Sequence, residues 1–185
     1  MKKSPLLFLS LVALALCSFA MFESRETTGV TKLKYQQYLS LFDKVELPYQ
    51  VALETGMFKM ANTIGATFSH FHEGLGRTFS RVGPSEYYAE AHIFSNEKIN
   101  VVLYSVIELR QGNRCSYYIH SIDNKGEIID SQFLMDFYAG AKHSCQINKD
   151  LSIVISFGSE QESKTFQIHP AGRLEKINNK TAMAD

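Results

Sequence analysis

The 185-residue chain contains no tryptophan and carries no formal net charge. Tryptophan is a common anchor in carbohydrate stacking and in interface hot spots. A neutral chain offers no electrostatic case for nucleic-acid binding, which usually needs a clustered basic surface. The sequence also lacks the G-x-S-x-G, G-x-x-x-x-G-K and C-x-x-C motifs of hydrolases, phosphate-binding loops and redox or zinc sites. We therefore expect no nucleic-acid partner and no cofactor, and the sequence argues against an enzyme.

The bulk composition is that of a folded protein. Hydrophobic residues make up 45% and charged residues 21% of the chain, which argues against disorder. The length suits one domain better than two. We expect a polar leader over residues 21–31, a single β-rich domain over 32–177, and a polar, disordered tail over 178–185.

Residues 1–20 are typical of a signal peptide. Two lysines precede an apolar stretch of eleven residues (6–16), which is too short to span about 30 Å of hydrocarbon as a helix. Ser18 and Ala20 supply the small residues of a cleavage site before Met21. Cleavage would leave 17 basic and 19 acidic residues and no transmembrane span. We expect an exported protein, periplasmic or secreted.

Cys17 offers an alternative localisation. A lipoprotein would be cleaved before this cysteine and lipid-modified on it. The familiar lipobox has a small residue directly before the cysteine, whereas this chain has Leu16, although Leu14 and Ala15 fit the pattern. Lipid anchoring through Cys17 is therefore the alternative to free export.

The second half of the chain repeats a strand-and-turn pattern. The clearest case is the hairpin from Cys115 to Phe137, because the turn at 123–126 contains Asp, Asn and Gly, which accept positive φ angles. The other expected strands are 87–94, 99–109, 144–148, 151–157, a strand around 166–168, and 174–177. About eight antiparallel strands in an up-and-down meander must curl into a barrel or pack their apolar face on another element.

The N-terminal part of the domain is the obvious cover for that sheet. Tyr35, Tyr38, Leu39 and Phe42 fall at helical spacing, which predicts a short amphipathic helix over 32–42 packed on the sheet. Residues 50–84 are rich in glycine and give only short strands and turns, with Ala66 to Phe71 as a candidate strand. The expected fold is mainly β: a curled or barrel-like meander with this helix on it.

Strict alternation along the strands sorts core from surface. It places Ile129, Phe133, Met135 and Phe137 on one face, as an apolar row that fills the core. Four aromatic or histidine residues lie on polar-faced strands: Tyr88, Tyr104, Tyr118 and His120. We expect the binding surface on the face that carries these tyrosines and this histidine.

Cys115 and Cys145 are the cysteines of the expected mature chain. An oxidising compartment favours a disulfide between them. In a single meander, however, one strand would separate them, which puts their Cα atoms about 9.6 Å apart, beyond the usual bridging limit of about 7 Å. Both fall on apolar faces, where a thiol behaves as a small hydrophobe. We expect two thiols, with the disulfide as the alternative.

His70 and His72 would share one face of a strand, as many metal-binding pairs do. Zinc or iron would need a third ligand, for which the candidates are His92, His120, Glu90 and Glu73. Two histidines alone are a weak signal, and surface histidines beside a buried Phe71 are the simpler interpretation.

Several segments together carry a resemblance. They are the basic, Leu-rich signal, the VELPY segment at 45–49, the DNKGEIIDS hairpin at 123–131, the NKDLSIVI turn and strand at 148–155, and the last strand after 170–172. In this layout the chain resembles small exported β-meander proteins of unknown function common in Bacteroides-type bacteria. Many of those have a proper lipobox, from which this chain departs. The resemblance implies an envelope location and an antiparallel sheet, and it assigns no functional residues.

The expected function follows from export and the missing catalytic motifs. We expect an envelope protein that acts as a non-catalytic binding module for an unknown envelope protein or polymer. One alternative is a small-ligand binder with a lipocalin-like barrel, since eight strands can enclose one ligand. Another is a metal-dependent enzyme around His70 and His72.

Overall fold

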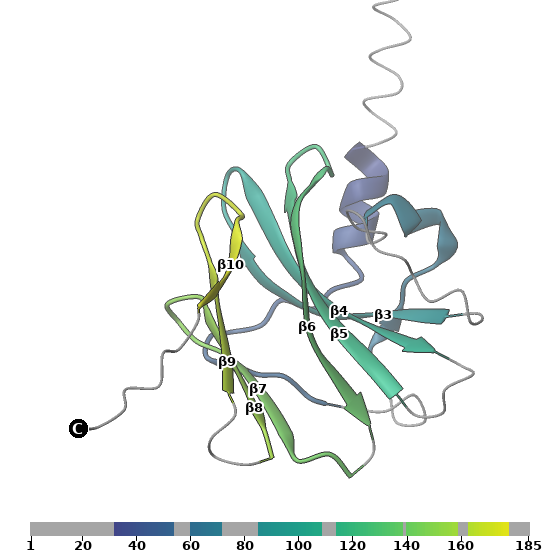
Figure 1. Ribbon diagram of the computed structural model, residues 1–185. Helices are drawn as coiled ribbons and strands as arrows, with labels where there is room; N and C mark the ends of the chain where they lie inside the picture. The colour runs from purple at the N-terminus through teal and green to yellow at the C-terminus, as the bar shows by residue number, and fades with distance from the viewer. Residues whose placement is uncertain are drawn as a thin grey trace, which may run out of the picture.

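The computed structural model describes residues 32–53, 60–71, 85–108, 114–138, 140–158 and 163–177. The described strands form two antiparallel five-stranded sheets (Figure 1). Sheet A has the order β2 (Asn62–Thr63), β3 (Ser85–Ser95), β4 (Ile99–Glu108), β5 (Arg114–Asp123) and β6 (Ile128–Tyr138). Sheet B has the order β1 (Tyr49–Gln50), β7 (His143–Ile147), β8 (Ser152–Phe157), β9 (Ser163–Ile168) and β10 (Leu174–Ile177).

The mainly β, antiparallel prediction is confirmed, but the barrel is wrong. The described residues form ten strands in two separate sheets rather than about eight in one curled meander. The break falls after β6, where long strands of 10 or 11 residues give way to strands of 4 to 6 residues. Two sheets packed face to face bury both apolar faces without closure. The described strands therefore do not form the closed barrel that the lipocalin-like alternative assumes.

Sheet A is covered on both faces. Every residue of β4 from Ile99 to Ile107 is buried, as expected of a central strand with cover on both sides. One core lies between the sheets and includes Leu103, Tyr117 and Ile155. A second core lies on the opposite face of sheet A and includes Tyr38, Phe71 and Tyr104. In Figure 1 the helix and sheet B lie on opposite sides of sheet A.

The second core is closed by two short helical segments. Residues 32–39 are helical, and their buried Tyr35 and Tyr38 face sheet A, as the apolar spacing predicts. The helix ends earlier than the expected residue 42, because the N–H groups of Leu41 and Phe42 bond to carbonyls three residues back. None of the described helices is long and apolar enough to cross a bilayer.

The candidate strand at Ala66–Phe71 is instead the 3₁₀ helix η2. Its three-residue period brings Phe68 and Phe71 to the same side. Both rings contact Tyr38, with centroid separations of 5.9 Å and 5.0 Å. Burial of these two rings against the N-terminal helix therefore overrides the alternation that suggested a strand.

Bulges break the strict alternation expected along two strands. In β6 the register with β5 skips Leu134 and Ile129, and in β3 the register with β4 skips Glu90 and Ile93. Each extra residue reverses which face the following side chains take. The predicted apolar row is therefore correct for two of its four members and wrong for the other two. Ile129 is 40% exposed, Phe133 contacts Tyr118, and Met135 and Phe137 belong to the core between the sheets.

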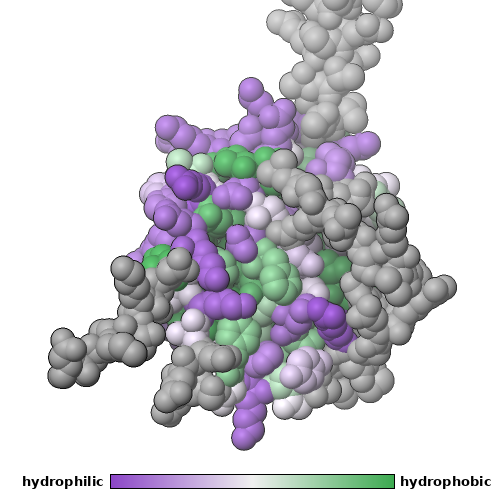
Figure 2. Space-filling model, in the orientation of Figure 1, coloured by the Kyte–Doolittle hydropathy of each residue, from purple (hydrophilic) through white to green (hydrophobic). Residues whose placement is uncertain are grey.

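The two sheets are joined at one corner by the turn before β10. The N–H of Leu174 donates to Asp130 Oδ2 over 2.8 Å, and Ser121 Oγ donates to the carbonyl of Gly172. Figure 2 shows apolar side chains gathered between β6 and the strands of sheet B, flanked by polar side chains. This side of the sandwich is therefore partly open to solvent.

Candidate functional site

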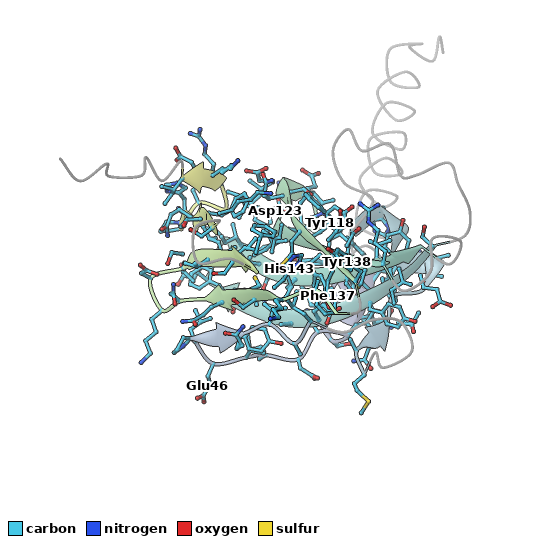
Figure 3. All side chains as sticks on the ribbon, turned by 60° about the horizontal axis from the view of Figure 1, so that its bottom comes forward. Glu46, Tyr118, Asp123, Phe137, Tyr138 and His143 are labelled. Atoms are coloured by element: carbon cyan, nitrogen blue, oxygen red, sulfur yellow. The ribbon has the colours of Figure 1, made fainter. Side chains whose placement is uncertain are left out.

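The strongest surface constellation lies where the chain passes from sheet A to sheet B. It consists of Phe137, Tyr138, His143, Phe157 and Lys164, which we call the aromatic corner. Figure 3 places the first three together, at the end of β6 and the start of β7.

The local chain path explains this grouping. Phe137 and Tyr138 end β6, and Gly140, at φ 87°, lies in the turn that follows. His143 then opens β7 opposite Phe157, the last residue of β8. The N–H of Gly158 donates to the carbonyl of Lys142 over 2.6 Å and fixes the two strand ends.

His143 is the centre of the aromatic corner. Its ring lies edge-on to Phe157 at 5.2 Å, to Tyr138 at 5.9 Å and to Phe137 at 6.5 Å between centroids. This T-shaped geometry is favourable for aromatic pairs. The ammonium of Lys164 lies 4.8 Å from the Phe157 ring centroid, as in a cation–π contact.

The aromatic corner is partly accessible to solvent, and one polar atom within it is buried without a partner in the part of the chain that the structure describes. Tyr138 is 55% exposed, and the rings around it are half-buried. The Nδ1 atom of His143 is buried and has no hydrogen-bond partner among the described residues. Lys142 and Lys164 add exposed positive charge beside the rings. Such a surface can hold an apolar or aromatic group next to a negative charge.

Three of the four residues expected to form a binding surface do converge, but inside the protein. Tyr104 and His120 are fully buried in the second core. The Tyr104 hydroxyl lies 3.0 Å from His120 Nε2, and the Tyr104 and Tyr118 rings stack at 5.3 Å. The other ring nitrogen of His120 lies 3.5 Å from the carbonyl of Phe71. This cluster therefore links η2 to sheet A and offers no surface at Tyr104 or His120.

Tyr88 lies on the other face of sheet A. It packs at the edge of the core between the sheets, and its hydroxyl donates to Glu86 over 2.6 Å. This hydrogen bond raises the pKa of Tyr88 to about 12. The four predicted residues therefore do not form one surface.

The expected metal pair is only partly within the described residues. His70 is exposed at the end of η2, where its ring lies 3.6 Å from that of Phe71 between centroids. Partial burial and the nearby Lys34 lower its pKa. His72 and Glu73 lie outside the described residues. Among the residues that are described, no three potential ligands come close enough to hold a metal ion.

Cys115 and Cys145 lie in different sheets. Cys115 is on β5 of sheet A and Cys145 on β7 of sheet B, so the expected arrangement of one intervening strand in a single sheet is wrong. Both belong to the core between the sheets, and the structure shows two thiols rather than a disulfide between them. Burial raises the pKa of Cys145 to about 12.

The aromatic corner was not predicted as a site from the sequence. The only sequence feature that indicates it is local: the aromatic pair Phe137–Tyr138 stands shortly before Gly140, and His143 follows three residues later. The contact with Phe157 depends on the pairing of β7 with β8. Comparison with protein-family models, with curated proteins and with solved structures gives no match. The resemblance to exported β-meander proteins therefore stays an expectation.

Proposed function

We propose that the protein is an exported envelope protein that acts as a non-catalytic binding module, and that the aromatic corner contacts its partner. The observation that carries this proposal is the half-exposed Tyr138 ring, which packs edge-on against His143 near the exposed Lys142 and Lys164. Tyr138 and His143 lie at strand ends of the two sheets, where backbone pairing with Arg114 and Phe157 holds them in place.

The chemistry of the aromatic corner suits an acidic, aromatic-containing segment of a partner protein. Aromatic side chains give large contact areas at a small cost in conformational entropy and are enriched at interface hot spots. Lys142 and Lys164 are exposed and would attract acidic side chains of the partner. The aromatic corner contains no nucleophile with a paired base, which favours binding over catalysis.

The test compares Tyr138→Ala with Ile177→Ala. Ile177 is an exposed apolar residue on β10, so its substitution controls for general loss of apolar surface. A partner recovered from the envelope fraction would be purified and titrated against the wild type and both variants by biolayer interferometry.

We expect Tyr138→Ala to weaken binding by at least about tenfold, or about 1.4 kcal/mol, while Ile177→Ala stays within about twofold. The thermal midpoint should be nearly unchanged in both variants, because neither side chain is buried in a core. Equal affinity of Tyr138→Ala and wild type, or no partner above control at several salt concentrations, would count against the proposal.

A further inference from the structure

A groove of about 350 Å³ with both polar and apolar lining lies on the other side of sheet A from sheet B. It runs between the N-terminal helix, the start of β4 and the turn that joins β5 to β6. Its lining residues are Lys32, Tyr35, Gln36, Leu39, Asn100 and Asn124. The volume falls within the range of small-molecule sites, about 300–1,000 Å³.

The base of the groove is built from two buried polar side chains. Tyr35 is 3% exposed and Asn100 is 9% exposed. The side-chain N–H of Asn100 donates to the Tyr35 hydroxyl oxygen over 2.9 Å. The hydroxyl hydrogen of Tyr35 has no acceptor among the described residues, so it is available to a ligand. A tyrosine hydroxyl keeps its hydrogen at neutral pH, and burial raises the pKa of Tyr35 further, to about 12.

The walls of the groove are mostly neutral and polar. Gln36 is exposed on the helix and carries both a donor and an acceptor. Asn124 uses its N–H to donate to the carbonyl of Glu97, which leaves its side-chain carbonyl as an acceptor. Leu39 adds one apolar contact, and Lys32 is the only charged lining residue among those described.

The donors and acceptors that line the groove favour ligands that can form hydrogen bonds with them. A purely apolar ligand would cover the buried Tyr35 hydroxyl and leave it unsatisfied, which is costly. A phosphate would meet a single lysine and several neutral acceptors. A neutral polyhydroxylated ligand offers donors and acceptors on every side and matches the mixture. We propose that this groove binds a neutral sugar of one or two residues, with Tyr35 donating from the base and Gln36 and Asn124 holding it from the sides.

This inference does not rest on the proposed function. The groove belongs to the helix-covered face of sheet A, whereas the aromatic corner packs against the core between the sheets. One protein could therefore hold a neutral sugar at the groove and a partner protein at the aromatic corner. Either site can fail its test while the other one stands.

Two-dimensional ¹H–¹⁵N NMR on the protein produced from its full sequence tests the groove directly. The probes are maltose and N,N′-diacetylchitobiose, each titrated into the millimolar range. We expect chemical-shift changes at the groove residues, with Tyr35, Asn100 and Asn124 among the largest. Neither probe should shift the signals of Tyr138 or His143.

Gln36→Ala is the variant, and Gln146→Ala on β7 is its matched control, because both remove an exposed glutamine side chain. Alanine is the best helix former, so the first substitution should not harm the helix. We expect Gln36→Ala to weaken the binding of the probe by at least about threefold, and Gln146→Ala to leave it unchanged. No saturable shift with either sugar, shifts centred elsewhere, or equal affinity of both variants would overturn the proposal.

Discussion

At the scale of single residues, Gly126 is the position where the hairpin turn meets the two helical segments. Its φ is +92°, a conformation that residues with a side chain rarely adopt. An added Cβ would lie 2.7 Å from Phe71 Cε1 and 3.3 Å from Tyr35 Cγ. The absence of a side chain therefore lets the turn pack directly against Tyr35 and Phe71.

Gly126→Ala should destabilise the protein through both backbone strain and a steric clash. The matched control is Gly140→Ala, because Gly140 has a φ of +87° and no atom within 4 Å of its Cβ position. We expect a loss of about 1–2 kcal/mol for the control and about 1–3 kcal/mol more for Gly126→Ala. Urea unfolding would measure both losses. Equal losses would show that the contact with Phe71 relaxes without cost.

His92 should make stability depend on pH. It is 7% exposed on β3. Its backbone N–H donates to the carbonyl of Asp43, and its carbonyl accepts from the N–H of Val45. Burial first, and the positive charge of Lys44 second, lower its pKa. The unfolded chain, with a histidine pKa of about 6.5, therefore binds a proton at a pH where folded His92 stays neutral. The free energy of unfolding should fall as the pH drops from about 6.5 towards the lower pKa of the folded state.

Denaturant unfolding at several pH values between about 7.5 and about 5 would measure this slope. His92→Gln should flatten it, because the variant has no imidazole to protonate. The comparison is His70→Gln: the pKa of His70 is also lowered, but the side chain is exposed, so the slope should change less. An unchanged slope in His92→Gln would contradict the assignment.

At the scale of elements, the sequence predicts most strands but not their faces. The β5–β6 hairpin, β8 and β10 lie close to where turn residues and β-branched runs placed them. The faces of β3 and β6 could not be read by alternation, because each strand contains two bulges. A bulge has no reliable residue signature here: Leu134 and Ile129 resemble their neighbours, and only pairing with β5 singles them out.

The same lack of information about pairing and cover explains why the candidate sites could be predicted only in part. Tyr104, Tyr118 and His120 do share a face, which alternation predicts correctly because pairing between β4 and β5 has no register shift. Alternation does not predict that these side chains are buried. Their burial depends on cover by η2, a segment whose sequence pattern predicts a strand. The groove and the aromatic corner join residues far apart in the chain, such as Tyr35 with Asn100 and His143 with Phe157.

At the scale of the whole molecule, the core between the sheets joins the two meanders into one unit. Cys115 and Cys145 lie on opposite sides of this core, because one is on sheet A and the other on sheet B. Their reactivity therefore measures the exposure of each sheet's side of the core. Both side chains are almost completely buried. Burial raises the pKa of Cys145 to about 12, so its reactive thiolate is scarce near neutral pH.

We therefore expect both thiols to resist iodoacetamide in the native protein and to react without reductant once guanidinium is added. Peptide mass spectrometry would follow each site separately. If the sheets separate only in global unfolding, the two sites should be labelled with the same dependence on denaturant. Labelling that requires a reductant would establish a disulfide and contradict the structure. Faster labelling of Cys145 would instead show that sheet B opens while sheet A stays folded, which its shorter strands would allow.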